Sequence, residues 1–289
     1  MARIDWMKIG GGLLGDIARF PRFTAPGPAG GARAVLIGGS HADDVLGPEV
    51  LRAVYKEAKQ GGLGLELVGW PVLPGSYGAV PRGGGHASGL SARIDAVVEN
   101  SYPGADAVIH LVSPGDEMEA APYALVPSRH RFPDDAAYER SVALAAALGT
   151  SYGIEDRDPH GLEAAAARTG VPVVRVVAGV RRSAGKEQRA DLRQRLGWML
   201  DAVAGGPGAP SPGALGRIDA VRASEAGFLH LRAQLDAPID PDVAIAATWA
   251  FEPDQVEEFH LPAGRILELR RKGRVEVGDV IARSISPLR

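Results

Sequence analysis

The sequence predicts an α/β fold, with a mostly parallel or mixed sheet flanked by helices, followed by a small all-β domain. Short apolar runs alternate with helical patterns over residues 34–203, which is typical of buried strands in βαβ units. Residues 205–216 are rich in Pro and Gly and read as a linker. Beyond them, only short β-type runs occur between turn residues. We therefore expect an α/β domain over residues 1–204 and a β domain over residues 217–289.

The composition excludes several classes of function. A chain of 289 residues suits one large and one small domain. The net charge of -3, from 32 basic and 35 acidic residues, gives no reason to expect binding to nucleic acid or to an anionic membrane. The chain has no cysteine, which excludes disulfides, thiolate zinc sites and a cysteine nucleophile. Residues 1–20 do not resemble a signal peptide and no apolar run is long enough to cross a bilayer, so we expect a cytoplasmic protein.

The first elements follow a strand–helix–strand pattern. Residues 24–33 are rich in turn-forming residues, and we expect them to be a loop leading into a first strand at residues 34–37. A helix over about residues 48–59, ended by glycines, precedes a strand over residues 65–72. This order favours a parallel sheet.

Further elements follow the same patterns. Within the α/β domain we expect helices over residues 91–99, 134–148, 160–170 and 186–203, and strands over residues 105–112 and 171–178. In the β domain we expect strands over residues 218–222, 227–231, 243–247, 264–269 and 280–283. An acidic loop is expected at residues 113–119. Residues 74–91 form a long Pro-, Gly- and Ser-rich loop, which is either functional or a surface insert.

The most informative stretch covers residues 34–49. Its apolar run ends at Ile37, and two glycines, His41, Asp43 and Asp44 follow before a helix begins. Ligands of α/β sheets bind at the carboxyl ends of strands, and the spacing His41-x-x-Asp44 lets an imidazole and a carboxylate meet at one metal ion. The alternative is a polar turn in which Asp43 or Asp44 caps the helix.

The order of these segments resembles the succinylglutamate desuccinylase and aspartoacylase family. Residues 37–49, IGGSHADDVLGPE, resemble the family's Gly-x-His-Gly-Asp-Glu segment, and residues 99–104, ENSYPG, resemble its Asn-Arg-x-Phe-Pro-Gly segment. Residues 105–112 resemble its strand ending in Asp-Leu-His, residues 170–179 its strand with the catalytic glutamate, and residues 275–282 its Val-x-x-Gly-Asp-Val pattern. The resemblance implies a zinc carboxypeptidase-like α/β domain and a barrel-sandwich-like C-terminal domain.

The resemblance also implies a site in which two histidines and a glutamate hold zinc and a second glutamate is the base. His41 matches the first ligand, and Asp44 stands in place of the ligand glutamate. The third ligand falls on Val112 and the base falls on Val177. Zinc is the only cofactor that the resemblance implies. At the positions expected for one zinc ligand and for the base, this chain has hydrocarbon side chains.

The substrate-binding groups implied by the resemblance are also changed. The family's Asn-Arg pair falls on Glu99 and Asn100, which places a negative charge where a substrate carboxylate would bind. Arg82 matches the arginine that follows the Asn-Pro segment. Arg82 and Asn100 are therefore the candidate substrate-binding residues.

The first hypothesis is a non-hydrolytic homologue. Valine neither binds zinc nor transfers a proton, and loss of a general base alone costs about 10²–10⁴ in rate. Such a protein would bind a small-molecule ligand or serve as an accessory subunit of an active paralogue. A homo-oligomer and a hetero-oligomer both stay open.

The second hypothesis is an active metal-dependent hydrolase of N-acyl amino-acid-type amides with a relocated site. His110 and Val112 share one face, because side chains alternate along a strand. His41, Asp44 and His110 would then form the ligand set. The alternative role for His110 is a core histidine whose ring nitrogens bond to the backbone.

Further residues are candidates for catalysis. The candidate bases from the neighbouring loops are Glu99, Asp116, Glu117 and Glu119. Arg175 shares a strand face with Val177, so we expect its side chain to point into the former cleft. A buried arginine needs a carboxylate partner, for which Glu99 and Asp44 are the candidates. Arg175 would then replace the positive charge of the missing metal.

Overall fold

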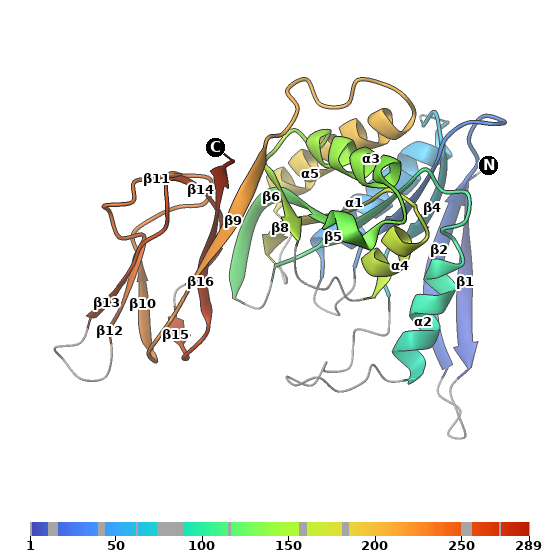
Figure 1. Ribbon diagram of the computed structural model, residues 1–289. Coiled ribbons are helices and arrows are strands. Elements are labelled where there is room, and N and C mark those ends of the chain that lie inside the picture. Colours follow the sequence, from blue (N-terminus) through green and yellow to red (C-terminus); the bar gives the residue numbers. More distant parts are fainter. Residues whose placement is uncertain are drawn as a thin grey trace.

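A computed structural model describes residues 2–10, 17–39, 44–61, 63–73, 89–114, 117–155, 161–180, 185–249, 256–271 and 273–288. This part of the chain forms a large sheet with helices on both faces and a second, smaller sheet near the C-terminus (Figure 1).

The helices are α1 (Leu46–Lys59), α2 (Gly89–Glu99), α3 (Asp135–Ala146), α4 (Leu162–Arg168) and α5 (Lys186–Val203), with a 3-10 turn η2 (Arg129–Arg131). None of the helices in the described ranges has the length and apolarity needed to span a bilayer. The strands of the first part of the chain are β1 (Arg3–Gly10), β2 (Ile17–Ala25), β3 (Arg33–Ile37), β4 (Glu66–Trp70), β5 (Ala107–Val112), β6 (Met118–Pro127), β7 (Tyr152–Glu155) and β8 (Val173–Val180). Those of the second part are β9 (Leu215–Arg222), β10 (Gly227–Leu231), β11 (Pro238–Ile239), β12 (Ala246–Trp249), β13 (Val256–Phe259), β14 (Gly264–Arg270), β15 (Gly273–Val275) and β16 (Val280–Pro287).

The centre of the large sheet confirms the predicted α/β class. Strands β4, β3, β5 and β8 are parallel neighbours in that order. The sheet is mixed because β2 and β6 flank this centre with antiparallel pairing. β3 is buried on both faces, which explains why its sequence is a continuous apolar run rather than an alternating one.

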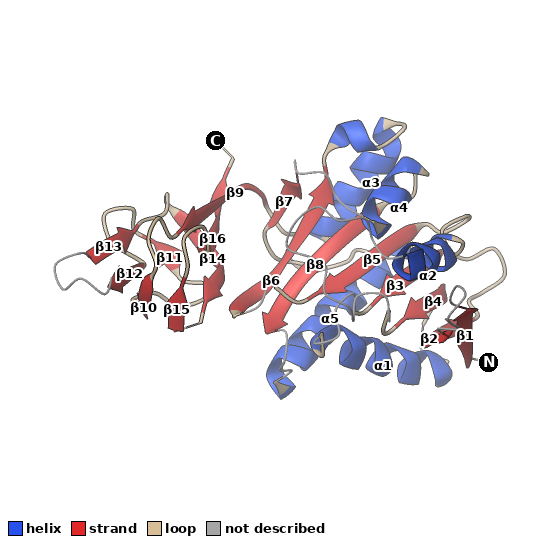
Figure 2. Cartoon of the chain, turned by 90° about the horizontal axis from the view of Figure 1, so that it is seen from below, coloured by secondary structure: helices blue, strands red, loops and turns tan. Residues whose placement is uncertain are grey.

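Helices cover the two faces of the central strands. Val35 and Ile37 of β3 pack with residues of α2 and α4, whereas Ala34 and Leu36 pack with residues of α1 and α5. Figure 2 shows α1 and α5 side by side along their face of the sheet. The surroundings of a side chain on β5 or β8 therefore depend on the face of the sheet to which it points.

The predicted loop of residues 24–33 is present over residues 26–32 and leads into β3. β3 is not the first strand, however, because two strands precede it. β1 and β2 form an antiparallel pair, and β2 extends the sheet beside β4. β1 is an edge strand, and its apolar residues Ile4 and Trp6 are 49% and 65% exposed. The apolar residues of β1 therefore do not identify which of its faces is buried. The sequence analysis also predicted no strand at β6 or β7; β6 begins at Met118, inside the expected acidic loop.

The C-terminal strands are joined to the α/β sheet by hydrogen bonds. Pairings within the described residues connect β6, β7, β9, β16 and β14 and return to β6, closing a ring of strands. The smaller sheet has the order β13-β12-β10-β15 and packs its apolar side chains on residues of β14 and β16. β9 begins at Leu215, within the predicted linker, and the domain boundaries stay a prediction.

Candidate functional site

The predicted residues of the first loop are only partly described. His41, Asp43 and Arg82 lie outside the described residues, so the roles predicted for them stay predictions. Asp44 is buried just before α1. Val45, not Asp44, is the N-cap residue of α1, and its side chain makes no capping hydrogen bond. The alternative in which Asp43 or Asp44 caps the helix stays a prediction.

His110 is held by a carboxylate from α4. Its Nδ1 lies 2.8 Å from Oε1 of Glu163, and both side chains are buried. The alternative in which backbone groups satisfy both ring nitrogens is therefore wrong. The other ring nitrogen, Nε2, is buried and has no hydrogen-bond partner within the described ranges. If Nδ1 donates to Glu163, Nε2 carries a free lone pair.

Arg175 binds the same carboxylate. Its Nε donates to Oε1 of Glu163 over 2.6 Å, whereas the sequence analysis expected Glu99 or Asp44 as the carboxylate partner. Arg175 and His110 are direct neighbours across β8 and β5, so they reach α4 from the same face. Burial by itself would raise the pKa of Glu163, but His110 and Arg175 hold this pKa well below its ordinary value.

Two acidic residues of α2 complete this group, which we call the His110 cluster: Asp95, Glu99, His110, Glu163 and Arg175. Burial and the negative charges of Glu99 and Glu163 raise the pKa of Asp95 to about 6, while His110 opposes this shift. The candidate base Glu99 therefore lies in the electrostatic field of the cluster. The sequence analysis did not single out Asp95 or Glu163. For Glu163, the available signal was a lone carboxylate in the first turn of the alanine-rich helix Leu162–Arg168.

Two valines occupy the positions at which the sequence resemblance expects a zinc ligand and a base. Val112 and Val177 are direct neighbours across β5 and β8. They belong to an apolar cluster, called the valine cluster, with Ala120, Tyr123, Leu125, Ile218, Leu267 and Ile285. Val177 is only 4% exposed. Side chains of the C-terminal strands β9, β14 and β16 therefore pack against the two valines.

A buried polar network lies beside the valine cluster. The Tyr123 hydroxyl donates to Oε1 of Glu268 over 2.5 Å, and Nη1 of Arg283 lies 2.9 Å and 3.0 Å from the two carboxylate oxygens. Burial and the charge of Glu268 raise the pKa of Tyr123 well above its ordinary value. Since Tyr123 is on β6 and Glu268 on β14, this network fixes the C-terminal strands to the α/β sheet.

Two further predicted residues, Glu117 and Asn100, are exposed. Glu117 is 61% exposed and pairs with Arg270 of β14 at 2.8 Å. Asn100 is exposed in the turn after α2. In the described ranges, no group of three or more His, Asp or Glu side chains is arranged to hold a metal ion. The set of His41, Asp44 and His110 stays a prediction because His41 is not described.

Comparisons with known proteins bear on the fold. No protein-family model matches the chain, and no curated protein matches its sequence. Among solved structures, the product-bound ectoine utilization protein EutE (DoeB) from Ruegeria pomeroyi has a TM-score of 0.81 and 18% identity, covering 98% of this chain and 94% of that chain. An aspartoacylase family protein from Mesorhizobium loti has a TM-score of 0.81 and 16% identity, covering 100% and 95%. A succinylglutamate desuccinylase from Silicibacter has a TM-score of 0.79 and 16% identity, covering 99% and 95%. The chain therefore has the fold of the succinylglutamate desuccinylase and aspartoacylase family, as its sequence resemblance predicts.

Proposed function

We propose that this chain is a non-hydrolytic member of the succinylglutamate desuccinylase and aspartoacylase family. It binds a small-molecule ligand or serves as an accessory subunit of an active paralogue. The observation that supports the proposal is the valine cluster, because it contains Val112 and Val177, the residues on which the sequence resemblance places a zinc ligand and the general base.

The chemistry of these positions supports the proposal. A catalytic zinc site needs three protein ligands and an open position for water. Val112 supplies no ligand, and Val177 supplies no group that accepts a proton from water. Leu267 and Ile285 pack in the same cluster, so the space beside the two valines is apolar. A carboxylate or a metal ion would be poorly solvated there.

Metal content and hydrolysis test this proposal together. Protein purified without chelator is analysed for zinc by mass spectrometry and incubated with a panel of N-acyl amino acids, including N-succinylglutamate and N-acetylaspartate. We expect less than stoichiometric zinc and no release of amino acid above the rate without protein. Stoichiometric zinc together with turnover would overturn the proposal.

A second candidate is metal-dependent hydrolysis of N-acyl amino-acid-type amides at a relocated site of His41, Asp44 and His110. The observation in its favour is the pair of His110 nitrogens: Nδ1 is bound to Glu163 and Nε2 is unpartnered within the described residues. Histidines that bind metals donate their other ring N–H to a carboxylate or carbonyl in the same way. When bound, zinc would polarise the amide and lower the pKa of a water molecule.

Variants separate the two candidates. If the relocated site binds zinc, His110→Ala abolishes zinc binding and Asp44→Asn weakens it. Glu117→Gln leaves zinc binding unchanged, because Glu117 is not a predicted ligand and pairs with Arg270 at an exposed position. Equal zinc content in all variants and in the wild type excludes His110 as a ligand. A cytoplasmic location, and the absence of binding to nucleic acid or membrane, are proposals that rest on the composition of the chain.

A further inference from the structure

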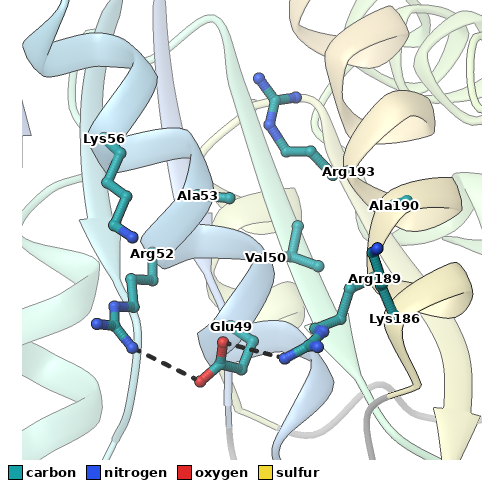
Figure 3. Close-up of a pocket in the computed structure, with 9 residues that line it drawn as sticks. All are labelled: Glu49, Val50, Arg52, Ala53, Lys56, Lys186, Arg189, Ala190 and Arg193. Carbon is teal, nitrogen blue, oxygen red and sulfur yellow. Dashed lines mark ion pairs between the residues drawn. The ribbon is translucent and has the colours of Figure 1, made fainter.

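A groove lined by cations runs between α1 and α5, on the face of the sheet opposite to the His110 cluster (Figure 3). Its volume is about 380 Å³. The cations that line it are Arg52 and Lys56 of α1 and Lys186, Arg189 and Arg193 of α5. Figure 3 shows Arg189 and Arg193 extending from α5 toward α1.

The spacing of these residues places each set on one face of its helix. Arg52 and Lys56 are four residues apart, and Lys186, Arg189 and Arg193 follow at intervals of three and four, as neighbours on a helical surface do. The two helices run side by side, because Arg189 pairs with Glu49 in the first turn of α1. The two rows of cations therefore face a common space.

Few carboxylates balance these charges. Glu49 is shared by Arg52 and Arg189 at 3.9 Å and 3.6 Å, and Glu57 pairs with Arg193. Five cations and two carboxylates leave a local charge of +3, in a chain whose net charge is -3. Within the described residues, neither Lys56 nor Lys186 has an ion-pair partner.

This arrangement does not stabilise the free protein. Like charges at neighbouring helical positions are destabilising, and ion pairs at an exposed surface contribute little. Burial also lowers the pKa of the Arg193 guanidinium, since the folded protein removes part of its hydration. A bound anion would compensate both costs.

We propose that the α1–α5 groove is a binding site for a phosphorylated small molecule. Arginine guanidinium groups bind phosphate oxygens through two parallel hydrogen bonds, and the lysines add point charges. The volume lies in the usual range for small-molecule sites. A nucleic acid would meet the carboxylates of Glu49 and Glu57 and a protein of net negative charge, which disfavours a long polyanion.

Glu49 has a defined part in this proposal. It is the one carboxylate among the described residues that line the groove, and its side chain lies between Arg52 and Arg189 (Figure 3). Its carboxylate pairs with the guanidinium groups of Arg52 and Arg189, which a phosphate would otherwise bind. Removing the charge of Glu49 should therefore strengthen binding, in contrast to removal of a cation.

Isothermal titration calorimetry with inorganic pyrophosphate tests the site. The full chain is titrated at low and at physiological ionic strength, together with Lys56→Gln, Arg189→Gln and Glu49→Gln. Arg140→Gln is the matched control, because Arg140 is exposed on α3, outside the groove. We expect each cation variant to bind about 10-fold more weakly, since hydrogen bonds to charged groups have this order of effect. Glu49→Gln should bind more tightly and Arg140→Gln should not differ from the wild type.

Other results would overturn the proposal. It fails if pyrophosphate does not bind at concentrations up to about 1 mM, or if the cation variants and Arg140→Gln bind equally well. Citrate and a single-stranded RNA oligonucleotide are titrated in parallel. Tighter binding of citrate would assign the groove to carboxylates, and tighter binding of RNA would assign it to a nucleic acid. The positions lie on exposed helix surfaces, and thermal unfolding of each variant without ligand verifies that it is folded.

Discussion

Introducing a glutamate at position 177, where the sequence resemblance expects the family's base, is the most direct test of the valine cluster. In the substitution Val177→Glu, a carboxyl group enters a site that is 4% exposed and surrounded by Tyr123, Leu267 and Ile285. The nearest cation of the polar network, Arg283, already binds both oxygens of Glu268. The new carboxylate would therefore be desolvated without a counterion, and we expect Val177→Glu to destabilise the fold at alkaline pH.

The magnitude follows from the pKa that such a group would adopt. Burial raises the pKa of a carboxyl group by up to about 3–5 units, and each unit corresponds to about 1.4 kcal/mol. At a pH above the raised pKa, the cost is therefore about 4–7 kcal/mol, which approaches the whole stability of a typical domain. The neutral control Val177→Gln has nearly the same shape and should cost only about 1–3 kcal/mol.

Urea unfolding at two pH values separates the charge from the shape. A folded-state pKa above the unfolded value of about 4.3 favours the protonated folded form, so the extra cost of Glu is absent below pH 4.3 and complete above the raised pKa. We expect Val177→Glu and Val177→Gln to have similar stability near pH 4.5 and to differ by several kcal/mol near pH 8.5. Equal stability of the two variants near pH 8.5 would refute the reasoning, because the carboxylate would then be solvated or paired.

Three further predictions concern buried polar groups. Glu163→Gln should lower the free energy of unfolding by about 3–5 kcal/mol at pH 7, measured by urea unfolding. Because the pKa of Glu163 is depressed, the difference in stability from the wild type should narrow as the pH falls below about 4.5. An unchanged free energy of unfolding at pH 7 would contradict this prediction. Asp95→Asn should stabilise the protein by about 1 kcal/mol at pH 8, allowing for solvent screening. Because the pKa of Asp95 is raised to about 6, this gain in the free energy of unfolding should vanish near pH 4. A gain of the same size at both pH values would argue against this prediction. Tyr123→Phe removes a donor from the buried carboxylate of Glu268 and should cost about 1–3 kcal/mol in thermal unfolding, whereas an unchanged melting temperature would show that the hydrogen bond contributes nothing.

The sequence predicts well those elements whose burial produces a simple pattern of apolar residues along the chain. Both faces of β3 and β5 are covered by helices, so their sequences are uninterrupted apolar runs bounded by turn residues. α5 was predicted with its observed bounds. β1 was missed because apolar residues lie on both of its faces: Ile9 is buried, whereas Ile4 and Trp6 are exposed. β6 was missed because a register shift between Ala120 and Tyr123 breaks its alternation.

The sequence predicts which strand residues face the candidate site, but not which helix residues they contact. Alternation along a strand placed His110 and Arg175 on a common face, and the structure brings them together across β5 and β8. Their shared partner, Glu163, lies 53 residues from His110 in the sequence and meets it through packing of α4 on the sheet. No local pattern links a helix residue to a particular strand neighbour, so the expected partners, Glu99 and Asp44, were chosen from the wrong elements.

The two clusters meet along β5, and their surroundings differ in chemistry. His110 and Val112 point to the same face of β5, about 7 Å apart along the strand, but α2 and α4 surround the first whereas β6, β14 and β16 surround the second. Among the described residues, the His110 cluster is therefore separate from the surroundings of Val112, the position at which the sequence resemblance expects the third ligand. In this part of the chain, acidic side chains of α2 and α4 accompany His110, whereas Glu117 lies on the other side of the valine cluster, where it pairs with Arg270 of β14.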